Sequence, residues 1–158
     1  MKEILFILSV LAVTVYLTVA AWEDHKTCEV TRWKHLIGGI PVVLLLCSKY
    51  SQHSWQEYAL ILVFSLLFVL AGCVGVYGMA DGYVLMILVL LFASIGGVVG
   101  IGMVILIMVI AGFSFVLTHL IKCIVKRRRL FQNMAAAFIP HILVGYVLIW
   151  IGVMIHAA

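Results

Sequence analysis

The chain has 158 residues, of which 66 % are apolar and 10 % are charged. A water-soluble domain carries about 25 % charged residues, so this composition excludes a soluble domain and indicates an all-α polytopic membrane protein, a single domain over residues 1–158. The formal net charge of +4 comes from one basic run and a few loop residues. That distribution is typical of membrane topology signals and not of nucleic-acid binding.

Two apolar stretches in the first third of the chain are predicted to cross the membrane. Residues 4–22 provide nineteen residues, enough for a hydrocarbon layer of about 30 Å. A cleaved signal peptide is the alternative, but this stretch is longer than a usual signal core. Residues 23–35 are the most polar segment and are expected to form a membrane-surface loop. Residues 36–48 are apolar for only thirteen residues and cross only with help from Trp33 and the snorkelling side chain of Lys34.

The rest of the chain has enough apolar sequence for four further spans. Residues 58–77 make one span, and residues 134–155 make the last. Between them, the forty residues 82–121 carry no Asp, Glu, Lys or Arg and would form a helix of about 60 Å, twice the membrane core. They are therefore expected to fold as two spans with a break near Gly96 and Gly97. The alternative is that these glycines lie within a helix as part of a small-residue contact face.

The basic residues orient the six spans. With the N-terminus outside, eight of the ten lysines and arginines fall in cytoplasmic loops, in agreement with the positive-inside rule. Lys2 and Lys49 fall outside, and the cytoplasmic residues are Lys26, Arg32, Lys34, Lys122, Lys126, Arg127, Arg128 and Arg129. The sequence therefore predicts a multi-pass protein of the cytoplasmic membrane.

The chain has only two aspartates, Asp24 and Asp81, and each lies at the edge of an apolar stretch. An ionised carboxylate beside hydrocarbon costs free energy, so such a residue is a functional-site hypothesis by default. The alternative is a solvated residue at a helix end or an N-cap. With two crossings between them, both aspartates are expected at the cytoplasmic end of the spans. If residues 36–48 do not cross, the two lie on opposite faces and cannot cooperate.

Two carboxyls that lie together are suited to aspartic-protease chemistry. They cannot both ionise cheaply, so one keeps a proton while the other is a base. Such a dyad polarises a water molecule and protonates a leaving amine, without a metal or cofactor. Gly78 and Ala80, just before Asp81, leave room for a substrate backbone. A proton or cation relay is the alternative for two acids at one membrane face.

The residue types that bind metals are scattered. The four cysteines include no Cys-x-x-Cys pair, and no two of the six histidines lie three or four residues apart on one span. The sequence therefore predicts neither a metal site nor a cofactor.

Three motifs, in chain order, resemble those of the type IV prepilin peptidases. Asp24-His-Lys-Thr-Cys-Glu-Val-Thr-Arg-Trp33 resembles the segment that carries their first aspartate, at the end of the first helix. Gly78-Met-Ala-Asp81, followed by Gly-Tyr, is similar to their Gly-x-Gly-Asp motif. Phe138-Ile-Pro-His-Ile-Leu-Val-Gly-Tyr146 is similar to a Pro-Phe-x-x-x-Gly stretch of their last helix. Together these matches cover nearly the whole chain.

The resemblance implies a membrane aspartyl endopeptidase of the Gly-x-Gly-Asp class, which also includes archaeal preflagellin peptidases, signal peptide peptidase and presenilin. It implies that the partners are prepilins or pseudopilins, cut at the cytoplasmic membrane face between a short basic leader and a hydrophobic helix. It assigns the catalytic pair to Asp24 and Asp81 and a backbone-shaping role to Gly78 and Ala80. The chain has no insertion with paired Cys-x-x-Cys motifs, which accompanies pilin methylation, and so resembles the small peptidase-only type of tight-adherence pili.

The sequence departs from the family pattern at four places. These are Ala80 for the second motif glycine, Thr31-Arg32 for Pro-Asn, His141 for Phe and Tyr83 for Lys. The departures motivate a second interpretation, a catalytically weakened protein that escorts pilins without cutting them. A small proton-coupled transporter is the third interpretation, in which only His119 and His141 would extend a relay deeper into the spans.

Overall fold

The computed structural model describes residues 2–49, 52–126 and 137–157, in which the regular elements are six helices. These are α1 (Lys2–Thr27), α2 (Lys34–Ser48), α3 (Trp55–Cys73), α4 (Met79–Gly96), α5 (Val98–Lys126) and α6 (Ile139–Ala157). Five of them are long and apolar enough to cross a membrane, whereas α2 has only 15 residues. The helix content and the five long apolar helices confirm the prediction of an all-helical, multi-pass membrane protein.

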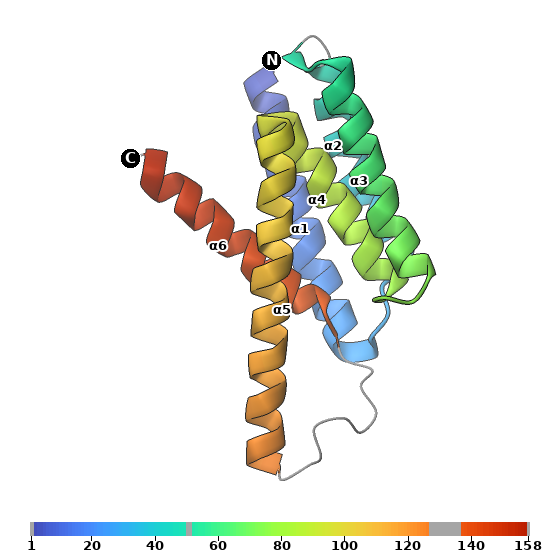
Figure 1. Ribbon diagram of the computed structural model, residues 1–158, viewed down its shortest axis with the longest axis vertical. Coiled ribbons are helices and arrows are strands. Elements are labelled where there is room, and N and C mark those ends of the chain that lie inside the picture. Colours follow the sequence, from blue (N-terminus) through green and yellow to red (C-terminus); the bar gives the residue numbers. More distant parts are fainter. Residues whose placement is uncertain (1, 50–51, 127–136, 158) are drawn as a thin grey trace.

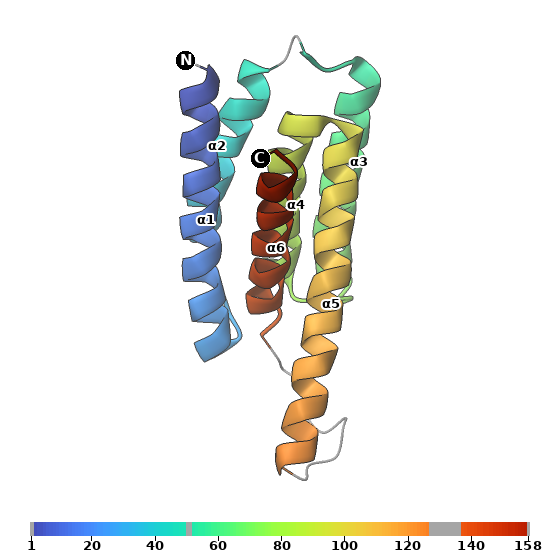
Figure 2. The same cartoon turned by 90° about the vertical axis from the view of Figure 1, so that its left-hand side faces the viewer.

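Helix α4 lies at the centre of the bundle (Figures 1 and 2). It packs against α2, α3 and α5, while α1 packs against α2 and α6, and α5 packs against α6. Eleven of the residues of α4 are buried, more than among the described residues of any other helix. The side chains of α4 are apolar on nearly every face, as expected for a helix that neighbours surround.

The long apolar stretch after Asp81 breaks at Gly97. The backbone of Gly97 has a φ of 54°, in the left-handed region that favours glycine, and its N–H donates to the carbonyl of Ala93 over 2.8 Å. Helix α5 then returns along α4 at close range, since a Cβ on Gly100 would lie 2.0 Å from the carbonyl oxygen of Phe92. The predicted break is confirmed, and a small-residue contact also follows it.

Helix α1 continues farther than predicted. Residues 23–27 are helical and not part of a surface loop, so Asp24 lies within the last turns of α1. The helix ends where Cys28 adopts a φ of 53°, with its N–H donating to the carbonyl of Asp24 over 2.8 Å. The hydroxyl of Thr27 donates to the carbonyl of Glu23 over 3.0 Å and supports this last turn.

Two other predicted boundaries are also wrong. Helix α3 ends at Cys73 and not at residue 77, because Gly75 (φ 83°) closes a Schellman motif in which the N–H of Val76 donates to the carbonyl of Ala71. Helix α6 begins at Ile139, because the two described residues before it are not helical, and Pro140 lies in its first turn, where proline is well tolerated. Residues 134–136 of the predicted span lie outside the described residues. Residues 127–136, with Arg127, Arg128 and Arg129 of the basic run, lie outside the described residues.

Helix α2 lies tightly against α1. A Cβ on Gly38 would lie 2.6 Å from the ring of Tyr16, so only glycine permits this approach. The hydroxyl of Ser9 donates to the carbonyl of Pro41 over 3.0 Å and ties the helices at a second level. One end of the bundle holds the end of α1 and the starts of α2, α4 and α6 (Figure 1).

Candidate active site

Asp24 is buried where α1 meets α6. The residue is 6 % exposed, and its Oδ2 accepts a hydrogen bond of 3.0 Å from the backbone N–H of Ile139. The first N–H groups of a helix have no partner within it, and Asp24 satisfies one of those of α6. The next residue, Pro140, has no N–H, and the N–H of His141 donates to the carbonyl of Phe138. The contact fixes the Asp24 carboxyl between two helices that are distant in sequence.

Asp81 is the third residue of α4 and is buried at the start of that helix. The residue is 7 % exposed, and its Oδ2 accepts a hydrogen bond of 3.0 Å from the backbone N–H of Gly78. A Cβ on Gly78 would lie 3.0 Å from the same oxygen, which is closer than real Cβ contacts normally are. Gly78 therefore leaves the space that the Asp81 carboxyl occupies, in keeping with its predicted shaping role.

The two aspartates face one cavity of about 580 Å³ at this end of the bundle. Asp24 and Asp81 are close enough to interact electrostatically. All four residues predicted for the site line the cavity, whose full lining is Asp24, Cys28, Glu29, Val30, Arg32, His35, Gly78, Met79, Ala80, Asp81, Tyr83 and Phe138. The structure thus brings together residues from α1, α4 and the segment before α6.

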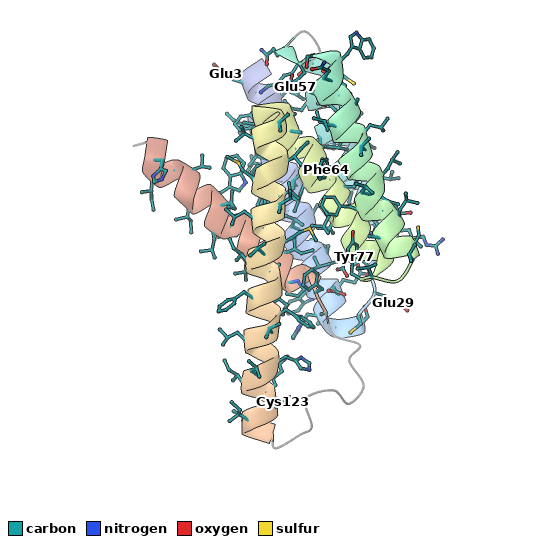
Figure 3. The ribbon with its side chains drawn as sticks, viewed as in Figure 1. Glu3, Glu29, Glu57, Phe64, Tyr77 and Cys123 are labelled. Carbon is teal, nitrogen blue, oxygen red and sulfur yellow. The ribbon has the colours of Figure 1, made fainter. Side chains whose placement is uncertain are left out.

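Tyr77 holds the turn that leads to Asp81 (Figure 3). Its hydroxyl donates to the carbonyl of Phe68 over 2.7 Å, which ties residues 74–78 to α3. Burial, together with the nearby Asp81 carboxylate, raises the pKa of Tyr77 above its ordinary value. The phenol therefore stays protonated and keeps donating across the neutral pH range.

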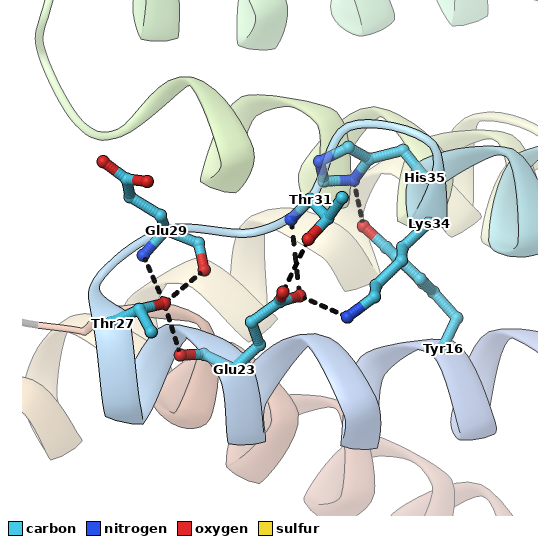
Figure 4. Close-up of polar contacts among 7 residues, drawn as sticks. All are labelled: Tyr16, Glu23, Thr27, Glu29, Thr31, Lys34 and His35. Atoms are coloured by element: carbon cyan, nitrogen blue, oxygen red, sulfur yellow. Dashed lines mark hydrogen bonds and ion pairs between the residues drawn. The ribbon is translucent and has the colours of Figure 1, made fainter.

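Glu23 organises the loop that covers one side of the cavity (Figure 4). Its carboxylate pairs with the Nζ of Lys34 at 2.8 Å and accepts a hydrogen bond of 2.6 Å from the hydroxyl of Thr31. The backbone N–H of Thr31 also donates to Glu23 over 3.3 Å. These contacts join α1 to the start of α2 and position the residues between them. The sequence does not single out Glu23 as a site residue, because its polar neighbours are typical of a solvated loop.

A cluster of Tyr16, His35 and Tyr83 connects three helices beside the cavity. The hydroxyl of Tyr16 hydrogen-bonds Nδ1 of His35, and the His35 and Tyr83 rings have centroids 5.1 Å apart. Tyr16 also lies within electrostatic range of Asp81. Sequence reasoning missed this cluster because its members are far apart along the chain. The one available signal was Tyr83, two residues after Asp81.

His141 lies on the α5 side of Asp24 and does not line the cavity. Its Nδ1 is 2.9 Å from the hydroxyl of Ser114, and its ring meets that of Phe115 edge-on. Within the described part of the chain, no group of three or more His, Cys, Asp or Glu side chains is placed to hold a metal ion. The absence of a metal or cofactor from the reaction stays a prediction.

The arrangement offers two buried carboxyls for acid–base chemistry. Each of the two carboxyls is held by a backbone N–H through its Oδ2, and both face the same cavity. Such a pair can share one proton and activate a water molecule between them. Comparisons with protein-family models, curated proteins and solved structures found no match to this chain.

Proposed function

We propose that this chain is a membrane aspartyl endopeptidase that removes the leader peptide of type IV prepilins or pseudopilins, with Asp24 and Asp81 as its catalytic pair. The observation that carries the proposal is that the only two aspartates of the chain, on helices α1 and α4, are buried at one cavity. Burial of two acids together is costly in free energy, and a function that needs both explains it.

The proposed reaction is hydrolysis with one proton shared by the dyad. The ionised carboxyl removes a proton from water as the water oxygen attacks the peptide carbonyl carbon, and the protonated carboxyl donates its proton to the carbonyl oxygen. The tetrahedral intermediate then collapses: one of its hydroxyls returns a proton to the ionised carboxyl as the carbonyl re-forms, the C–N bond breaks, and the departing nitrogen takes the proton held by the other carboxyl. The products are a carboxylic acid and an amine, and the dyad regains its starting state.

The surroundings of the dyad fit a peptide substrate. Gly78 and Ala80 line the cavity next to Asp81, so a substrate backbone meets small residues there. Lys34 and Arg32 lie at the cavity end of α2. We place this end at the cytoplasmic face and the N-terminus outside, in keeping with the positive-inside rule.

The test is cleavage by the purified protein in lipid vesicles, with a full-length prepilin as substrate and mass spectrometry as the readout. The proposal expects a single new N-terminus after the leader, no added methyl group, and the same rate with EDTA present. A substrate that stays intact while proton flux or pilin delivery is detected would favour a transporter or an escort protein. A methylated product in this system would contradict the peptidase-only assignment.

A further inference from the structure

An apolar groove runs along α2 from the aspartate cavity into the membrane-spanning part of the bundle. It has a volume of about 460 Å³, within the range of roughly 300–1,000 Å³ typical of ligand pockets. Its apolar walls are formed by Leu36, Gly39, Ile40, Val43 and Leu44 of α2 and Met86 of α4. Arg32, His35 and Tyr83 line both the groove and the cavity, so the two spaces adjoin at these residues.

The groove lies on the face of α2 that does not pack against α1. Leu36, Ile40 and Leu44 are 60 %, 57 % and 55 % exposed, and they recur once per helical turn. Gly38 meets Tyr16, whereas a Cβ on Gly39 would meet no atom within 4 Å. From residue 35 to residue 44 the groove extends about 13 Å along the helix, less than half of a hydrocarbon layer of about 30 Å.

The connection to the cavity specifies what the groove would hold. A peptide bond placed between the aspartates needs a path for the chain that follows it, and the groove provides an apolar path into the bilayer. A segment in hydrocarbon must satisfy its own backbone hydrogen bonds, so a chain that follows this path is helical. A helix that packs on these side chains must also be apolar on its contact face.

We propose that the groove binds the membrane-spanning helix of the substrate and seats the first turns that follow the scissile bond. This inference rests on the proposed function and names the docking surface for its substrate. The groove would thereby align the junction between the leader and the apolar helix with Asp24 and Asp81. Substrates whose apolar helix begins at the scissile bond would be preferred over those with a polar spacer.

Gly39→Leu tests the groove without disturbing the rest of the fold. A leucine at this position meets no protein atom at its Cβ and favours the helix, but it fills the groove. Gly112→Leu is the matched control, because a Cβ on Gly112 of α5 also meets nothing within 4 Å and lies away from the groove. Gly39→Leu should raise KM for a full-length prepilin by about tenfold or more with little change in kcat. Gly112→Leu should match the wild type.

A photocrosslinking measurement separates this inference from the proposed function. A benzoylphenylalanine at position 40, in the Asp81→Asn protein, should crosslink to the first three turns of the prepilin helix. The same probe at position 106, an exposed site on α5, should label lipid and not the prepilin.

Each outcome of the two measurements has a definite reading. Crosslinks from position 40 together with a wild-type protein that never cleaves would support the groove and contradict the protease. Cleavage by the wild type, with an unchanged KM in Gly39→Leu and only lipid crosslinked at position 40, would overturn the groove and leave the protease standing.

Discussion

The Oδ2 atom of Asp24 accepts a hydrogen bond of 3.0 Å from the backbone N–H of Ile139, so one carboxylate joins the last turns of α1 to the first turn of α6. The same carboxylate faces the cavity that Asp81 lines from α4. Asp24 is therefore a structural link between two helices as well as a proposed catalytic group. Variants of this residue have to be chosen so that the two roles are separated.

The link to α6 predicts that Asp24→Ala and Asp24→Asn differ in stability. Alanine leaves the buried N–H of Ile139 without its acceptor and should lower the free energy of unfolding by about 1–2 kcal/mol. Asparagine keeps a side-chain oxygen for this N–H and should stay close to the wild type. Thermal unfolding in detergent measures both, and an asparagine variant as unstable as the alanine variant would argue against the link.

The close approach between Gly78 and Asp81 predicts that one methyl group added at residue 78 slows catalysis. Gly78 has a φ of −65° and a ψ of 145°, which any residue adopts, so Gly78→Ala acts through the 3.0 Å approach to Asp81 Oδ2. The displaced carboxyl should lower the cleavage rate on the order of 10- to 100-fold, with helix content unchanged. Gly102→Ala is the control and should cleave normally, because a Cβ on Gly102 of α5 meets nothing within 4 Å and lies away from the cavity. Wild-type cleavage by Gly78→Ala would show that the Asp81 position tolerates this shift.

The contacts of Glu23 predict local order in the loop between α1 and α2. Glu23→Gln removes the ion pair with Lys34 and weakens the acceptor for Thr31, so amide hydrogen exchange at residues 28–33 should become faster while exchange in α4 stays the same. Glu29→Gln is the control, because the Glu29 side chain points away from Glu23 in Figure 4. Equal exchange in both variants would mean that Glu23 does not order this loop.

The proposed orientation predicts opposite labelling of the two ends of α2. In a protein that keeps Cys28 and has serine at the other three cysteines, an impermeant maleimide should label Cys28 only from the cytoplasmic side. In a cysteine-free background, Gln52→Cys should be labelled only from the outside, because residue 52 follows α2 at the opposite end of the bundle. Labelling of both positions from the same side would contradict the crossing of α2.

The parts of the fold that depend on local sequence were predictable. The forty residues without Asp, Glu, Lys or Arg exceed the thickness of a membrane, so a break was required, and Gly97 supplies the left-handed backbone for it. The position of both aspartates at one end of the bundle agrees with the two crossings predicted between Asp24 and Asp81. These features need only chain length, hydropathy and glycine placement.

The parts that depend on distant partners were not predictable. Asp24 finds its hydrogen-bond donor 115 residues away, and no local pattern indicates Ile139 as that donor. The polar residues of the last turns of α1 are typical of a loop, whereas the Thr27 hydroxyl and the neighbouring α6 support a helix there. Such contacts depend on how helices that are distant along the chain pack together, and the local amino-acid composition does not indicate them.

The most direct test of the dyad is the cleavage rate of Asp24→Asn, Asp81→Asn and the double variant, measured on one prepilin in lipid vesicles. Asparagine is nearly isosteric with aspartate but cannot share a proton or act as a base, so each single variant should lose on the order of 10²- to 10⁴-fold in rate. The double variant should be no worse than either single one, because the two groups act as a unit. Glu3→Gln, at the opposite end of α1, is the control and should cleave normally. Cleavage near the wild-type rate by either single variant, with the protein folded, would contradict the account.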